Sequence, residues 1–495
     1  MTEVTYTKKA LEKRLDSIVS ETLGDIDVNG AFGKTINNPK VTGIAGDVIE
    51  KSVLGYDSNS IQEPDIIVDN KRTEVKTTGI RYSTNSLKKG KQSNKDFEAK
   101  EPMSITAVSP DKIVNESFEN SNFWHKLNYL LLVFYHYDSQ RPVKSWEYKD
   151  FVVKGYEFHE FSDTEKQALK NDWEKVKNFI LDAQKSYMDP TERYPFLGAE
   201  LRKNLLFIDT APKWPHNPRF RLKRSTVTAI VQQYFGKKLE ELPAEYDSFH
   251  DIDEKLHEIS DKFKGKTVRE LINYYGIKIQ KNKDGDAPKN VSEQIMVRMF
   301  GGTSKKLSQI DLFKKAGITL KTLTQTRQGK RTEDTKLFPI DFERLVSDDD
   351  FESSEFSEFF SEKQFIFIVF EEPSGDAKLL DNKFVGFKRL SFGDDFIQDQ
   401  VKYAWMNTKK LVEQDLLVEK QVLNQKTKKP ITNKNGTIRT TLNFLKSKQN
   451  VVFVRGSGVD SSKKPLFLNG IHMYTQYIWV KGDYLVRLLS KESFI

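Results

Sequence analysis

Apolar residues recur along the chain at two spacings, which predict helices and strands in alternation. Residues 8–23, 47–54 and 164–187 place them on one helical face, and Gly55 ends the second helix. A further helix is predicted at residues 225–235, with Ser225 as its cap. The predicted strands are residues 65–68, 73–77, 104–108, 128–137, 146–153, 205–208 and 220–222. This alternation is typical of an α/β fold, a mixed sheet flanked by helices.

The pattern starts again after residue 240, which predicts an internal duplication. Five matches occur in the same order. Residues 47–55 resemble 293–301, Asp65 falls opposite Asp311, 73–77 fall opposite 318–322, 131–134 fall opposite 367–370, and Trp173 falls opposite Trp405. We therefore expect domains at residues 1–240 and 241–495. Two unrelated α/β domains with similar patterning are the alternative.

Composition narrows the class of protein. The chain has 495 residues, a net charge of +8 and no cysteine, which excludes disulfide scaffolds, thiolate zinc sites and cysteine nucleophiles and is typical of a reducing cytoplasm. No apolar run approaches the ~18 residues that cross a bilayer, and the N-terminus lacks an apolar signal core. We expect a cytoplasmic protein with no membrane partner. The basic balance is compatible with a polyanion partner and does not identify one.

Candidate chemistry lies in the segment Pro-Asp-Ile-Ile-Val-Asp-Asn-Lys-Arg-Thr-Glu-Val-Lys-Thr, where two short strands meet at a turn of residues 69–71. Glu74 and Lys76 share one face of their strand while Val75 points to the core, and a neighbouring strand can bring Asp65 beside them. Two carboxylates suit Mg²⁺, which keeps its other positions for water and substrate phosphate. Glu50 on the preceding helix can complete the cluster. The alternative is a solvated, charged strand face.

The second copy loses part of this pattern. Met296 stands opposite Glu50 and Thr319 opposite Glu74, while Asp311 and Lys321 keep the types of Asp65 and Lys76. One carboxylate holds Mg²⁺ poorly, so we expect the second copy to be catalytically inactive.

At these residues the sequence resembles the MutH-like endonucleases. The shared features are the helix with Glu50, then Asp65, then Thr-Glu-Val-Lys-Thr at 73–77, Trp-His-Lys-Leu at 124–127, and Phe-Arg-Leu-Lys-Arg at 220–224 before a closing helix. The resemblance covers nearly the whole chain, and the doubled layout is similar to the Sau type of restriction enzyme. It implies two restriction-endonuclease-like domains of the PD-(D/E)xK kind. In the first, Asp65, Glu74 and Glu50 would bind metal, Lys76 would position water, and Lys126 would be a further catalytic or phosphate-contacting lysine. A solvated helix-end lysine is the alternative for Lys126, and Glu362 falls opposite it in the second copy.

Residues for DNA binding are predicted with less definition. In the family a strand and loop before the final helix reads the bases. Here that region offers Lys213, Arg221, Lys223 and Arg224, which fit phosphate contacts equally well. The basic loops at 83–100, with Lys88 and Lys89, and at 425–434 are either DNA-gripping arms or solvated loops.

The function that the resemblance implies is Mg²⁺-dependent cleavage of duplex DNA at GATC, 5′ of the G on each strand. The second copy would bind DNA as a non-catalytic effector and support a transient homodimer, and a cognate methyltransferase would protect the host. The alternatives are a mismatch-repair nickase of the MutH type and a non-catalytic DNA-binding regulator.

Overall fold

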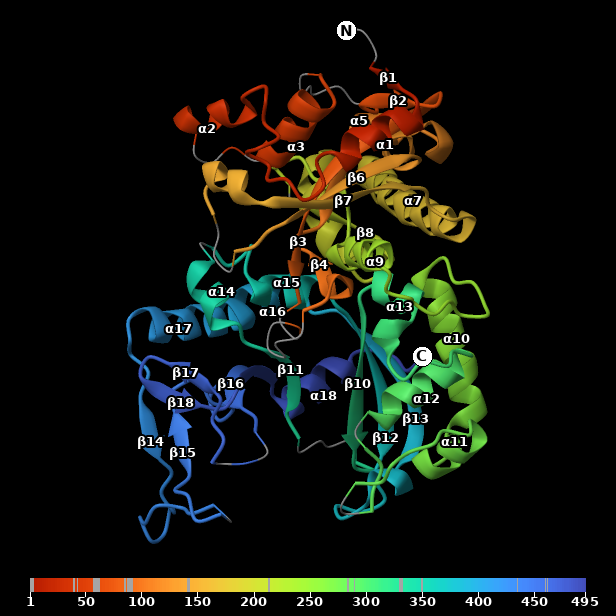
Figure 1. Ribbon diagram of the computed structural model, residues 1–495. Coiled ribbons are helices and arrows are strands. Elements are labelled where there is room, and N and C mark those ends of the chain that lie inside the picture. The colour runs from red at the N-terminus through yellow and green to blue at the C-terminus, as the bar shows by residue number, and fades with distance from the viewer. Residues whose placement is uncertain are drawn as a thin grey trace. The chain divides into compact units, whose positions relative to one another are not determined.

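The protein folds into two units in a computed structural model (Figure 1). The first unit holds Met1–Ser139, Val143–Glu258 and Asn290–Thr319, and the second holds Ile259–Lys289 and Leu320–Ile495. The domain boundary at residue 240 stays a prediction, because the first unit also takes in a segment from the second half of the sequence. The structure describes residues 4–38, 41, 43–56, 63–83, 86, 92–139, 143–211, 214–282, 285–288, 290–328, 333–348, 350–433, 435–458, 460 and 462–495.

A six-stranded mixed sheet forms the centre of the first unit. Its strands run in the order β1-β2-β3-β6-β7, with β4 paired to β3. β3 and β6 are parallel, whereas β2 and β7 lie antiparallel to their neighbours β3 and β6. The strands are β1 (Thr5–Tyr6), β2 (Ile66–Val68), β3 (Lys71–Tyr82), β4 (Phe97–Ala99), β6 (Leu130–His136) and β7 (Val152–His159). β6 is buried at six of its seven positions, as its continuous apolar run predicts.

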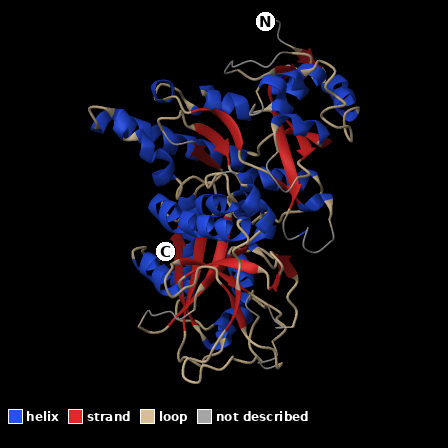
Figure 2. Cartoon of the chain, turned by 90° about the vertical axis from the view of Figure 1, so that its left-hand side faces the viewer, coloured by secondary structure: helices blue, strands red, loops and turns tan. Residues whose placement is uncertain are grey.

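A second, three-stranded sheet lies in the same unit, in the order β5-β9-β8. It consists of β5 (Met103–Ala107), β9 (Arg219–Leu222) and β8 (Ile208–Ala211). Helices accompany both sheets (Figure 2). They are α1 (Lys8–Asp16), α2 (Lys34–Asn37), α3 (Ile44–Val48), α5 (Pro110–Ile113), α6 (Asn122–Leu127), α7 (Asp163–Ser186), α8 (Leu197–Leu201), α9 (Arg224–Tyr234), α12 (Val291–Met299) and α13 (Asp311–Lys315), while α10 (Phe249–Phe263) runs across the unit boundary.

The second unit contains another pair of three-stranded sheets. One has the order β10-β12-β13 and the other β11-β19-β16. The elements are β10 (Ile318–Gln325), β11 (Thr335–Pro339), β12 (Gln364–Glu371), β13 (Lys383–Leu390), β16 (Val452–Gly456) and β19 (Gln476–Val480), the ribbons β14 (Glu419–Gln421) with β15 (Thr440–Leu442) and β17 (Leu466–Leu468) with β18 (Ile471–Met473), and the helices α11 (Val268–Tyr274), α14 (Phe342–Ser347), α15 (Glu355–Glu362), α16 (Asp394–Phe396), α17 (Lys402–Glu413) and α18 (Gly482–Ser490). Among the described residues, no helix combines the length and apolar character that a bilayer span requires.

The two sets of sheets share irregularities as well as part of their strand order: β3-β6-β7 corresponds to β10-β12-β13, and β5-β9-β8 to β11-β19-β16. The pairing of β6 with β7 shifts register beside Gly155, and the pairing of β12 with β13 shifts beside Gly386. These glycines have φ values of +153° and +149°. A side chain on Gly155 would overlap Tyr234 from the end of α9, and one on Gly386 would press on Phe494 after α18. A shared bulge beneath a shared aromatic residue supports the duplication.

A second correspondence lies around the helix before each buried strand. Ser121 and Ser354 are both fully buried helix caps, and each donates to the carbonyl three residues earlier, of Phe118 or Phe351. Phe118 contacts Trp173 at 6.0 Å between ring centroids, and Phe351 contacts Trp405 at 5.8 Å. Counting from these caps places Phe359 opposite Lys126, whereas the sequence alignment placed Glu362 there, and the pairing of Lys126 with Glu362 stays a prediction. Neither Phe359 nor Glu362 supplies a lysine.

Five predictions about local structure are wrong. Residues 97–99 form β4 because Phe97 and Ala99 are fully buried and Phe97 stacks on Tyr82. The predicted strand at 146–153 is a 3₁₀ helix over Ser145–Asp150 that precedes β7, because the Glu147 carboxylate accepts the Lys144 backbone N–H. The helix that begins at residue 8 ends at Asp16, and the strand predicted at 205–208 lies at 208–211. The N-cap position of the helix predicted at 225–235 is Lys223 and not Ser225, because the Ser225 hydroxyl donates to the Lys315 carbonyl.

Candidate active site

The predicted hairpin forms as the sequence indicates. Asp69 and Asn70 adopt positive φ values of 45° and 66°, which suit a tight two-residue turn between antiparallel strands. Ile66 pairs with Thr73, so Asp65 lies opposite Glu74. The Val75 backbone N–H donates to Asp65 Oδ2 at 2.9 Å. This bond fixes the Asp65 carboxylate against β3.

Glu74 is the most buried carboxylate of the cluster. Its side chain is 1% exposed and accepts Lys76 Nζ at 2.6 Å. Lys126 Nζ donates to both Glu74 oxygens, at 2.9 and 3.0 Å. Two ammonium groups therefore offset the charge of one buried carboxylate, which would be costly if unpaired. Val75 is buried in the core, so β3 alternates as predicted.

Lys126 reaches the cluster from a separate element. It lies in α6, which begins at the buried cap Ser121 and precedes β6 directly. Because β6 is parallel to β3, with Leu130 beside Glu74, the end of α6 meets the strand at the level of Glu74. The parallel pairing thus brings together residues that are 52 positions apart in sequence.

Glu50 and Asp65 are electrostatically linked to the same cluster. Glu50 lies in a π-helical turn, Ile49–Val53, that continues α3. Burial, followed by the charges of Asp65 and Asp47, raises the pKa of Glu50 to about 7, while Lys76 opposes the shift. Burial and the charge of Glu74 likewise raise the pKa of Asp65. Such mutual repulsion between carboxylates is the setting that a bound cation relieves.

The donor set fits a hard divalent cation. Asp65, Glu74 and Glu50 supply carboxylate oxygens, the ligands that Mg²⁺ prefers, and Mg²⁺ needs only one or two of them from protein. In the part of the chain that is described, no three His, Cys, Asp or Glu side chains form a ready-made cage for a metal ion. The fit is therefore that of a site to which substrate phosphate and water contribute ligands.

Tyr56 is a neighbour of the cluster that the sequence analysis missed. Its backbone N–H donates to the Glu50 carbonyl at 3.0 Å, which fixes it one residue after Gly55. Its hydroxyl is buried and has no hydrogen-bond partner among the described residues. Burial raises the pKa of Tyr56, and the charges of Asp65 and Glu50 raise it further. The signal available in the sequence was its position directly after the helix that carries Glu50.

The predicted DNA-binding residues have different environments. Arg221 donates to both oxygens of Asp209, at 2.7 and 3.0 Å, from the paired strands β9 and β8. Lys223 is 3% exposed and its ammonium donates to the Leu205 and Leu206 carbonyls. In this conformation Lys223 holds backbone together and does not face a phosphate. Arg224 donates to the Ala99 carbonyl at 2.8 Å. The other three predicted residues, Lys88, Lys89 and Lys213, lie outside the described residues.

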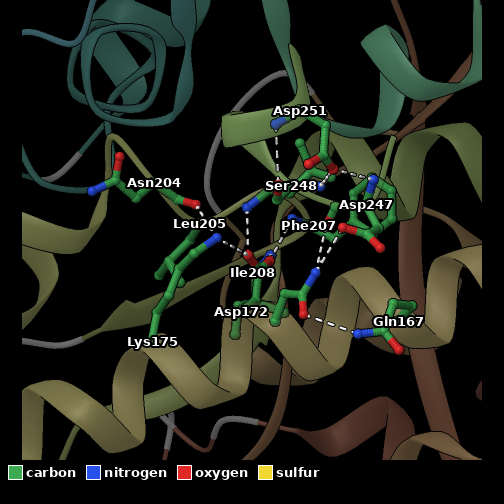
Figure 3. A network of polar contacts seen from close by, with 12 residues as sticks. Gln167, Asp172, Lys175, Asn204, Leu205, Phe207, Ile208, Asp247, Ser248 and Asp251 are labelled. Carbon is green, nitrogen blue, oxygen red and sulfur yellow. Dashed lines mark hydrogen bonds and ion pairs between the residues drawn. The ribbon is translucent and has the colours of Figure 1, made fainter. Parts of the chain in front are cut away.

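A buried aspartate on α7 anchors the same region (Figure 3). Asp172 is fully buried, and its carboxylate accepts the backbone N–H groups of Leu206, Phe207 and Ile208 at 2.8, 2.8 and 3.2 Å. Burial raises its pKa, while Lys175 and these N–H groups oppose the shift. Asp172 thereby fixes where β8 begins.

The second copy shows what became of the corresponding positions. The Tyr137 N–H donates to the Ile80 carbonyl of β3, and the Glu372 N–H donates likewise to the Gln325 carbonyl of β10. Counting back six residues from each carbonyl pairs Glu74 with Thr319, and counting back four pairs Lys76 with Lys321, as the sequence alignment predicted.

The four residues that the sequence analysis assigned to a second, degenerate site do not share the arrangement of the first site. Met296 is fully buried in α12. Asp311 does not precede a strand as Asp65 does; it begins α13 and pairs with Lys315 at 2.7 Å. Lys321 Nζ donates to the Lys336 carbonyl at 2.9 Å. Thr319 supplies no carboxylate at the position of Glu74.

The arrangement in the first unit defines a nuclease domain of the restriction-endonuclease-like fold, with a hairpin that presents Asp65, Glu74 and Lys76 on a mixed sheet. Residues 54–172 match the family model described as DNA mismatch repair enzyme MutH. The chain is also 24% identical, over 97% of its own length and 97% of the relative's, to the type II restriction enzyme Sau3AI of Staphylococcus aureus. Both findings confirm the resemblance to MutH-like type II restriction endonucleases seen in the sequence, together with its α/β fold.

Proposed function

We propose that this protein is a Mg²⁺-dependent type II site-specific deoxyribonuclease that cuts duplex DNA at GATC, 5′ of the G on both strands. The observation that carries the proposal is the convergence of Asp65, Glu74, Lys76 and Lys126 on one end of β3. Similarity to a type II restriction enzyme along nearly the full chain supports the whole-protein assignment. Its biological role would be restriction of foreign DNA in the cytoplasm, with a cognate methyltransferase protecting host sites.

The residues divide the chemistry between them. Asp65 and Glu74, with Glu50 beside them, would hold Mg²⁺, which when bound supplies Lewis-acid polarisation of the phosphate and a more acidic water. Lys76 lies on the same strand face as Glu74 and would orient the attacking water by a hydrogen bond. Lys126 would hold a phosphate oxygen and offset the charge that develops there. Tyr56 would donate its unpaired hydroxyl to this cluster or to a bound water, as a positioning residue.

The second copy would act as a DNA-binding effector without chemistry of its own. It lacks carboxylates opposite Glu50 and Glu74, so it cannot reproduce the cluster. A protein with one active centre cuts one strand at a time, and a transient homodimer on DNA would cut both.

A mismatch-repair nickase remains the second candidate, because the family model that matches residues 54–172 is described as a mismatch repair enzyme. The experiment incubates the full chain with supercoiled plasmid, methylated or unmethylated at GATC, with and without Mg²⁺, and sequences the ends. Linear fragments that begin with GATC support the type II enzyme, and nicked circles alone support the nickase. Binding without any cleavage in Mg²⁺ would instead identify a DNA-binding regulator.

A further inference from the structure

The excess of basic over acidic residues in the chain is concentrated in one stretch of the second unit, residues 416–464. It contains eleven basic residues and two acidic ones, a net charge of +9, whereas the whole chain carries +8. The other 446 residues together therefore carry a net charge of −1. The basic residues are Lys420, Lys426, Lys428, Lys429, Lys434, Arg439, Lys446, Lys448, Arg455, Lys463 and Lys464, and the acidic ones are Glu419 and Asp460.

The N-terminal half of this stretch, residues 419–442, forms an arm. Its base is the antiparallel pair β14 and β15, in which Glu419 pairs with Leu442. Beyond β14 the chain doubles back twice. The Val422 N–H donates to the Arg439 carbonyl at 2.9 Å, and the Ile431 N–H donates to the Val422 carbonyl at 2.8 Å. The arm is thus held by its own backbone hydrogen bonds, although most of its side chains are exposed.

Three lysines are displayed at one turn of the arm. Asn424 Oδ1 accepts the backbone N–H groups of Lys426 and Thr427, at 2.9 and 3.1 Å. The Asn424 N–H donates to the Lys429 carbonyl at 2.8 Å, and Lys428 adopts a positive φ of 56°. This closed turn presents the side chains of Lys426, Lys428 and Lys429 within four consecutive positions, all of them exposed.

Most of these basic side chains are not neutralised by salt bridges to carboxylates within the described chain. Lys464 pairs with Glu419 and Arg455 with Asp334. Among described residues, no salt bridge joins a carboxylate to the exposed basic side chains of Lys420, Lys426, Lys428, Lys429, Arg439 and Lys448. An ordered arm that carries several exposed cations without described salt bridges matches a regularly charged polyanion better than a point ligand.

We propose that the arm, residues 419–442, binds the phosphate backbone of duplex DNA and supplies much of the binding strength of the second copy. The partner rests on the proposed function, since duplex DNA is the polyanion that the nuclease must hold. Each lysine that neutralises a phosphate releases counterions, so the contact is salt-dependent and independent of base sequence. The arm would grip DNA at any sequence and leave base reading to other elements.

The test compares two triple variants of the full chain with the wild type. One replaces Lys426, Lys428 and Lys429 by Ala; the control replaces Lys9, Lys13 and Lys185, exposed lysines of the first unit that make no described salt bridge. Affinity is measured by fluorescence anisotropy over a salt series, on duplexes with and without GATC. We expect the arm variant to lose about tenfold or more in affinity near 0.1 M salt on both duplexes and to lower the salt slope by about three. The control should stay within about twofold, and the triple Arg variant of the arm should retain wild-type affinity.

Several results would overturn the proposal. Equal losses in the arm variant and the control would reduce the effect to net charge, and a loss confined to the GATC duplex would make the arm a base reader. Unchanged DNA affinity with lost binding to phosphatidylserine vesicles would assign the arm to a membrane. The nuclease function is read separately, from plasmid cleavage by the wild type. DNA binding that depends on the arm, without any cleavage, would refute the nuclease function and support the arm as a DNA-binding element. Cleavage with DNA affinity that does not depend on the arm would support the nuclease function and refute the role of the arm.

Discussion

The strands β3 and β10 are built alike and differ where chemistry is expected. In each strand a backbone carbonyl accepts the N–H of the residue that directly follows the next buried strand, and the order β3-β6-β7 corresponds to β10-β12-β13. In β3 a buried glutamate holds two lysines. In β10 the corresponding residue is Thr319, and Lys321 binds a backbone carbonyl. The framework around the two strands is similar although only β3 carries a carboxylate at this position, so the framework alone does not identify a candidate active site.

The largest expected difference between the copies lies at their lysines. Replacing Lys76 by Ala should reduce cleavage by about a thousandfold or more, because an electrostatic contribution to the transition state is lost, while DNA binding is retained. Replacing Lys321 by Ala should leave single-site cleavage within about threefold. Single-turnover cleavage and binding of both variants measure this contrast. Equal losses in the two variants would remove the distinction between an active and an inactive copy.

The shared bulges offer a stability comparison. Replacing Gly155 by Ala should destabilise the protein by about 2–4 kcal/mol, since the new methyl would overlap Tyr234 at a positive φ. Replacing Gly386 by Ala should cost about 1–2 kcal/mol, because Phe494 lies 3.1 Å from the new carbon and can move. Denaturant unfolding followed by near-UV circular dichroism measures both changes. A neutral Gly155→Ala would show that the bulge is not a constraint.

Glu50 carries a titratable carboxyl group, whereas Met296, the residue aligned with it in the second copy, does not. Folding raises the pKa of Glu50 from 4.5 to about 7, so the native state holds this proton more tightly than the unfolded chain does. Metal-free protein should therefore lose stability as the pH rises from about 4.5 through 7. Glu50→Gln has no such titration and should gain on the wild type at pH 8 relative to pH 5. Thermal unfolding in a chelator gives both differences, and an identical gap at the two pH values would contradict the burial of this charge.

The smallest effect is expected at Tyr56. Replacing it by Phe should lower the cleavage rate by about two- to tenfold, the worth of one hydrogen bond. The metal-free protein should keep or slightly gain stability, since an unpaired buried hydroxyl is removed. Cleavage rate and melting temperature are read on the same preparation. Parallel losses of activity and stability would make Tyr56 a packing residue only.

Local patterning foretold the hairpin but not its surroundings. Alternation and the Asp69–Asn70 turn were sufficient to place Asp65 opposite Glu74 and Val75 in the core. The contact of Lys126 with Glu74 depends on the parallel pairing of β3 with β6, which no local pattern encodes. Family resemblance pointed to Lys126 itself but not to this contact. The burial of Lys223 depends on two carbonyls before β8, and a basic residue in a basic run gives no sign of that.

Asp311 shows the converse failure. The sequence keeps an aspartate opposite Asp65, yet the structure makes it the first residue of a helix, paired with Lys315 four residues later. An i,i+4 ion pair is a local helical signal, and it was outweighed by the expectation of a repeat. A conserved residue type across two copies is therefore weaker support for a shared role than the hydrogen bonds around it.

The two-residue turn at Asp69 and Asn70 also sets a limit for anyone who redesigns this enzyme. Because side chains alternate along β3, one residue inserted before Thr73 would turn Val75 toward the site and would turn Glu74 and Lys76 toward the hydrophobic core of the protein. Deleting a residue would do the same. Only changes of two residues preserve the facing of the strand, and these would still shift Asp65 along it. The length of the hairpin therefore decides which side chains face the site, so engineering for new activities is best confined to the elements around it.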